Sequence, residues 1–170
     1  MHNAALKRRR SLARELSRAA NADTLAALSA AIPSGGHAAW RIGITGAPGS
    51  GKSSLIAQLA RERLKDLPVD TRERLAVLAI DPSSPLSQGA LLGDRLRMNA
   101  VSDDSRLYFR SLSSRGGRDG LTHNIVDLLA IIDAYDFDEV ILETVGVGQV
   151  EHAVRVLVDS LVLVLHPESG

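Results

Sequence analysis

The sequence contains no cysteine, and only 3% of its 170 residues are aromatic. The first absence excludes a disulfide framework and a thiolate metal site, and the second leaves few side chains on which bases stack. The formal net charge is zero, which argues against a broad electrostatic surface for nucleic acid. No apolar run approaches the roughly 18 residues of a membrane span, and the basic start of the chain lacks the apolar stretch of a signal peptide. We therefore expect a cytoplasmic protein that binds neither nucleic acid nor membrane.

One motif carries most of the functional information: residues 46–53, Gly-Ala-Pro-Gly-Ser-Gly-Lys-Ser, match G-x-x-x-x-G-K-[ST] at every fixed position. In such a phosphate-binding loop (P-loop), glycines let backbone N–H groups converge on phosphate oxygens. Lys52 supplies a charge for the β- and γ-phosphates, and the Ser53 hydroxyl is placed to ligate Mg²⁺. A strand-like run precedes the motif and a helical run follows it, as a P-loop requires. We predict a nucleoside triphosphate site formed by Gly46, Ala47, Pro48, Gly49, Ser50, Gly51, Lys52, Ser53 and Ser54.

The chain before this motif differs in composition from the rest. Residues 4 to about 31 are rich in Ala, Leu and Arg in a helical pattern, with a break near Asn21. The basic cluster at 7–10 fits either a solvated helix end or a contact with an anionic partner, and we expect the former. We therefore divide the chain into an N-terminal helical segment with its linker at 1–36 and a nucleotide-binding domain at 37–170.

From residue 40 onward, strand-like and helical stretches alternate. We expect strands at 40–45, 75–80, 106–110, 138–143 and 160–165, and helices at 52–65, about 88–100, 121–134 and about 149–157. Aliphatic strands joined by helical crossovers imply an α/β fold with a mostly parallel sheet covered by helices on both faces. Ligands of such sheets bind beyond the carboxyl ends of the strands, so the residues that follow each strand form the candidate site.

Two acidic residues follow the second predicted strand. Asp81 comes directly after it and can reach the Mg²⁺ ion or orient the attacking water, although Asp-Pro-Ser-Ser also suits an Asx-Pro turn. Asp94 is either a second acidic group of the site or a helix N-cap or surface charge. The residues alone leave both alternatives open.

The fourth predicted strand ends in Glu143, three residues before Gly146. An acidic residue and a glycine at this spacing are typical of the second phosphate-side element of P-loop proteins. The carboxylate holds Mg²⁺, usually through water, and the glycine N–H can sense the γ-phosphate because no side chain is in the way. Glutamate is less common than aspartate at this place.

These segments resemble those of a known family. Five of them occur in the order found in the MeaB/ArgK group of G proteins: Asp81-Pro82-Ser83-Ser84, Gly93-Asp94-x-x-Arg97-Met98, Phe109-Arg110-Ser111, Ser114-Arg115-Gly116 and Glu143-Thr144-Val145-Gly146-Val147-Gly148-Gln149. The last signature is peculiar to that group and accounts for the glutamate. The resemblance covers residues from about 40 to 170.

The resemblance implies a SIMIBI-class P-loop fold, GTP and Mg²⁺ as cofactors, slow hydrolysis, and a chaperone function toward an adenosylcobalamin-dependent acyl-CoA mutase such as methylmalonyl-CoA mutase. Full-length family members are homodimeric. The catalytic residues implied are Lys52, Asp81, Asp94 and Glu143; the metal-binding residues are Ser53, Asp81, Asp94 and Glu143; Gly146 is a further nucleotide contact.

The chain also departs from the family pattern. Gly-Gly is usual where this sequence has Asp119-Gly120, and a serine is usual at Val150. The sequence ends at Gly170, before the guanine-reading Asn-Lys-x-Asp element and the C-terminal dimerisation arm of the family. We therefore expect a truncated product or a fragment, in which the preference for GTP over ATP rests on the resemblance alone.

Three other functions compete with this interpretation. A metallochaperone GTPase shares the fold but usually needs cysteine or a His-rich tract, whereas this chain has five scattered histidines that we expect to be surface or core residues. A kinase would need an acceptor site and a lid, and no segment indicates either. The truncation keeps a third alternative open, a catalytically impaired fragment that only binds nucleotide or a partner.

Overall fold

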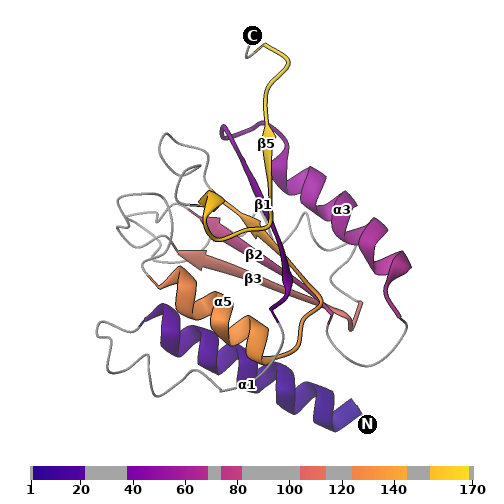
Figure 1. Cartoon of the computed structure of the whole chain (residues 1–170). Coiled ribbons are helices and arrows are strands. Elements are labelled where there is room, and N and C mark those ends of the chain that lie inside the picture. Colours follow the sequence, from indigo (N-terminus) through magenta and orange to yellow (C-terminus); the bar gives the residue numbers. More distant parts are fainter. Residues whose placement is uncertain are drawn as a thin grey trace.

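The computed structural model describes residues 2–21, 38–68, 74–81, 104–113, 124–144 and 154–168. Within these ranges the chain forms a parallel five-stranded sheet of order β3-β2-β4-β1-β5 (Figure 1). The strands are β1 (Trp40–Gly46), β2 (Leu75–Asp81), β3 (Leu107–Ser113), β4 (Glu139–Glu143) and β5 (Ser160–Val164). The helices are α1 (His2–Ala20), α3 (Lys52–Asp66) and α5 (Ile125–Ala134). The predicted α/β fold is thereby confirmed.

Helix α3 covers one face of the sheet, and α5 covers the other with α1 alongside it (Figure 1). Ile56, Ala60 and Leu64 of α3 pack against Ile44 of β1 and its neighbours. Their spacing of four residues puts them on one stripe of the helix, which is buried while the opposite side meets water. Leu55, which precedes Ile56 in the helix, lies at the edge of this stripe and is 41% exposed.

Helix α1 belongs to the core on the second face. Its residues Leu12, Leu16 and Ala19 are at most 1% exposed and lie in one apolar cluster with Leu128 of α5 and Leu142 of β4. The predicted break near Asn21 agrees with the end of this helix. Residues 22–37 lie outside the described ranges, so the division of the chain at residue 36 stays a prediction.

Two arginines of α1 make tertiary contacts. Arg8 donates to the backbone carbonyl of Tyr135, and its guanidinium lies 5.6 Å from the centre of that ring. Arg9 donates to a carbonyl of β3 at 3.2 Å and lies 5.7 Å from the centre of the Tyr108 ring. A guanidinium can donate in its plane and stack on an aromatic face at once. The prediction of a solvated helix end at 7–10 is therefore wrong for these two residues.

The strand order fixes where a ligand can bind. After β1 the chain crosses to β2 and β3, returns as β4 between β2 and β1, and then reaches β5 on the far side of β1. Ligands of open parallel sheets bind at the carboxyl ends of strands whose connections leave in opposite directions. In this sheet those strands are β1 and β4, which carry the P-loop and the predicted Mg²⁺ carboxylate.

The expected elements agree with the observed ones apart from their ends. Strand β3 starts one residue later than predicted and continues to Ser113, because it pairs with β2 as far as Asp81. The helix predicted at about 88–100 lies outside the described residues, and only 154–157 are described of the one at about 149–157. No helix in the described part of the chain is long and apolar enough to cross a membrane.

Candidate nucleotide site

The predicted P-loop forms the turn from β1 into α3. Gly46, Gly49 and Gly51 have positive φ angles of 148°, 80° and 91°. A Cβ atom on Gly46 would lie 2.2 Å from the carbonyl oxygen of Val164 in β5, so only glycine lets the two strands approach this closely. Gly51 is the left-handed N-cap of α3, whose first N–H groups have no partner within the helix. This helix start is a favourable position for an anion.

Lys52 is the first residue of α3, and its ammonium group folds back onto the loop. Its Nζ donates to the carbonyl oxygens of Gly46 at 2.8 Å and Ala47 at 2.9 Å. The residue is only 8% exposed. Within the described residues no carboxylate pairs with this ammonium. A buried cation of this kind gains most from an anion brought by a ligand, which is the property that a phosphate site needs.

Ser53 and Glu143 are in direct contact. The Ser53 hydroxyl donates to Oε1 of Glu143 at 2.8 Å, across 90 residues of sequence. Ser53 lies in the first turn of α3, and Glu143, which is 8% exposed, is the last residue of β4. Hydroxyl and carboxylate oxygens are the hard donors that Mg²⁺ prefers, so this pair fits the predicted ion. The structure thus brings together two of the four predicted metal-binding residues.

The other predicted site residues divide into exposed residues, one strand-end residue and residues outside the described ranges. Ala47, Pro48 and Gly49 form the exposed tip of the loop, and Ser54 is exposed on α3. Asp81 ends β2, the strand next to β4, and therefore lies at the same edge of the sheet. Asp94 and Gly146 lie outside the described residues, so their roles stay predictions. Among the described ranges there is no group of three or more His, Asp or Glu that could hold a metal ion.

Three residues at this edge were not singled out from the sequence. His166 follows β5, and its Nε2 lies 3.5 Å from the carbonyl oxygen of Pro48 in the loop, 118 residues away. Thr45 and Thr144 are 0% and 1% exposed, and neither hydroxyl has a hydrogen-bond partner among the residues that the structure describes. Thr144 was quoted only within the family signature, and no local pattern signals the surroundings of the three side chains, which depend on which strand ends meet in the fold.

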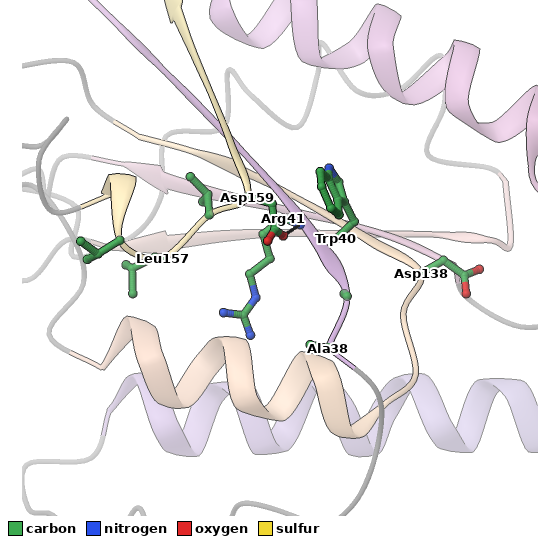
Figure 2. A pocket seen from close by; sticks show the side chains of 9 residues that line it. Ala38, Trp40, Arg41, Asp138, Leu157 and Asp159 are labelled. Atoms are coloured by element: carbon green, nitrogen blue, oxygen red, sulfur yellow. Dashed lines mark hydrogen bonds between the residues drawn. The ribbon is translucent and has the colours of Figure 1, made fainter.

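A separate hollow of about 460 Å³ lies at the opposite, amino end of β1 (Figure 2). Its lining includes Trp40, which is 55% exposed, and Val156, which is 82% exposed. Arg41 points away from Trp40 toward α5 (Figure 2). There it forms an ion pair with Asp133. The P-loop follows the carboxyl end of the same strand, so the length of β1 separates this hollow from the predicted phosphate site.

Comparison with known proteins gives the family. A family model described as methylmalonyl-CoA mutase-associated GTPase MeaB matches residues 9–170. The chain belongs to the MeaB family. This match confirms the resemblance drawn from the five sequence segments. It begins within α1, well before the P-loop.

Relatives of this MeaB chain share its sequence over most of its length. A provisionally named GTPase of Pyrococcus abyssi is 44% identical over 132 residues, which are 78% of this chain and 39% of that protein. A fused isobutyryl-CoA mutase of Nocardia farcinica is 46% identical over 129 residues, 76% of this chain and 12% of that protein. The solved structure of a LAO/AO transport system kinase shares the fold, with a TM-score of 0.61 and 23% sequence identity. The match covers 96% of this chain and 49% of the kinase chain. The chain therefore spans less than half the length of each of these proteins.

Proposed function

We propose that this chain binds GTP together with Mg²⁺ and slowly hydrolyses the bond between the β- and γ-phosphates. The observation that carries the proposal is the 2.8 Å hydrogen bond from Ser53 to Glu143. It places two oxygen donors beside a P-loop whose buried lysine is paired with carbonyls alone among the described residues. A Mg²⁺ ion complements the two oxygen donors, and the phosphates of a nucleotide complement the buried lysine.

Each side chain has a defined part in the proposal. Lys52 turns from the loop carbonyls toward the phosphates, while the first N–H groups of α3 bind phosphate oxygens. Ser53, Asp81, Asp94 and Glu143 are the residues that would hold the ion. When bound, Mg²⁺ neutralises charge that develops on the phosphate oxygens. In this proposal the backbone N–H of Gly146 contacts the γ-phosphate.

The proposed client is an adenosylcobalamin-dependent acyl-CoA mutase in the cytoplasm. Two comparisons support it: the family description names methylmalonyl-CoA mutase, and in the Nocardia farcinica relative the matching segment is part of a fused isobutyryl-CoA mutase. A GTP-dependent switch acts on such a client only if the client binds the GTP-bound and GDP-bound states of this protein with different affinities. We further propose that the whole protein is a homodimer.

The decisive experiment is turnover measured with GTP and ATP in parallel, with and without purified methylmalonyl-CoA mutase. We expect Mg²⁺-dependent release of phosphate from GTP at a rate that changes when the mutase is added. Binding without turnover would favour the impaired fragment that only binds nucleotide. Turnover that prefers ATP and ignores the mutase would contradict both the nucleotide and the client.

A further inference from the structure

Two buried threonines flank the proposed GTP site. Thr45 directly precedes the first glycine of the P-loop, and Thr144 directly follows Glu143. They are 0% and 1% exposed, and within the described ranges neither side-chain hydroxyl has a hydrogen-bond partner. Ser50 of the loop also has a buried Oγ atom that finds no partner in the described part of the chain. Unpaired hydroxyls therefore gather at the edge of the sheet where the phosphates are proposed to bind.

The two threonines are lateral neighbours in the sheet. Ile44 of β1 is paired with Glu143 of β4, and the Thr144 N–H donates to the Ile44 carbonyl at 3.0 Å, so the ladder continues by one residue. Side chains alternate along a strand, so Ile44 and Glu143 face α3 whereas both threonines face the opposite side. Neighbouring strands lie about 4.8 Å apart, which places the two threonines side by side beneath the strand ends.

A hydroxyl buried without a partner is unfavourable, and valine would fill nearly the same space without that cost. Folded proteins pair almost all such groups, and the exceptions concentrate at functional sites. Most other buried positions of the sheet hold aliphatic residues such as Val77, Leu78 and Ile141. Hydroxyls at these two positions would be favourable in a second state of the protein in which they are bonded.

We propose that Thr45 and Thr144 are positioning residues whose hydroxyls gain hydrogen bonds only when a nucleoside triphosphate occupies the P-loop. The inference rests on the proposed function. Each threonine is covalently next to a phosphate-side group, Gly46 on β1 or Glu143 on β4, so a small shift of either strand end moves its hydroxyl. Bonds gained in that state favour the triphosphate over the diphosphate, because a ligand shifts an equilibrium only through its different affinities for the two states.

The test uses Thr45→Val and Thr144→Val, with Thr45→Ser and Thr144→Ser as matched controls that keep the hydroxyl. Affinities for GDP and for the non-hydrolysable analogue guanosine 5′-(β,γ-imido)triphosphate are measured by calorimetry with Mg²⁺. We expect each valine variant to bind the analogue about threefold to tenfold more weakly, as the loss of one hydrogen bond implies. GDP affinity should change by less than about twofold, and the serine variants should match the wild type.

Thermal unfolding without nucleotide distinguishes this role from a structural one. The valine variants should unfold at the wild-type temperature or above it, because no hydrogen bond is lost in that state. A lower unfolding temperature would show that the hydroxyls are already bonded, for instance to a permanent buried water, and would overturn the proposal. Equal losses for GDP and the analogue, or no loss, would overturn it while leaving GTP binding intact. Wild-type protein that binds neither nucleotide would instead refute the proposed function, and this inference with it.

Discussion

The Ser53 hydroxyl donates a 2.8 Å hydrogen bond to Glu143, which joins the first turn of α3 to the end of β4. Each partner is fixed by its own element. The helix packs into the sheet through Ile56 and its neighbours, and β4 is paired on both sides, with β1 and with β2. Two oxygen donors are therefore held by regular elements, which position a site more precisely than loops do.

Replacing Glu143 with glutamine tests its part in this pair. The amide oxygen can still accept the bond from Ser53, but the side chain no longer balances the charge of a metal ion. We expect nucleotide affinity to change by less than about threefold and Mg²⁺-dependent turnover to fall about tenfold or more. Single-turnover hydrolysis measures this, with Glu62→Gln in α3 as the control. Unchanged turnover would leave Glu143 with a purely structural role.

Replacing Lys52 with alanine removes the buried cation of the loop. The lost charge-assisted contact is worth roughly 1.5–3 kcal/mol, or about tenfold to a hundredfold in nucleotide affinity. Lys65→Ala is a suitable control, because that lysine lies in the last turn of the same helix and its side chain is 61% exposed. Calorimetric titration that gives equal affinities for the wild type and Lys52→Ala would contradict the P-loop assignment.

Alanine substitutions at two glycines of the loop distinguish the free-energy cost of backbone strain from the cost of a steric clash. Both have positive φ, but a Cβ on Gly51 meets nothing within 4 Å, whereas a Cβ on Gly46 meets the Val164 carbonyl at 2.2 Å. We expect Gly51→Ala to lower the free energy of unfolding by about 1–2 kcal/mol through strain alone. Gly46→Ala should cost clearly more, because β1 and β5 must also separate. Denaturant unfolding without nucleotide measures both, and equal losses would show that the strand contact yields easily.

Strand β5 gives rise to a prediction about association. In the described sheet it is an edge strand that pairs only with β1. Leu163 in this strand is 53% exposed, and Leu165 directly after it is 62% exposed. Exposed apolar edges promote pairing between chains, so we expect the 170-residue chain to self-associate. Leu163→Lys should shift sedimentation toward monomer, whereas Val126→Lys, at an exposed position of α5, should not. A wild-type chain that sediments as a stable monomer would contradict this prediction.

The sequence could predict those features that neighbouring residues determine. The glycine spacing located the P-loop and the start of α3 at Lys52, and the aliphatic runs located all five strands of the described sheet. Strand ends were less certain, because the last residues of β3 are strand only through their pairing with β2.

Contacts between distant segments were not predictable. Arg110 entered the sequence analysis only as part of a family motif, yet it donates to the Ala13 carbonyl at 2.9 Å and the Ser17 hydroxyl at 2.8 Å in α1. These partners lie 97 and 93 residues away. Periodicity marks the buried stripe of α1 but does not say which surface it meets. The same holds for Ser53 and Glu143, whose contact depends on β4 lying next to β1.

The single tryptophan of the chain stands at the start of the strand that ends in the P-loop. Trp40 is 55% exposed beside the hollow of Figure 2. From Trp40 to Gly46 the strand rises by six steps of about 3.3 Å, or roughly 20 Å in all. A bound nucleotide on the P-loop therefore cannot touch the indole. Intrinsic fluorescence of this protein reports on the remote end of β1, so an emission change on adding GTP would reveal movement transmitted along that strand.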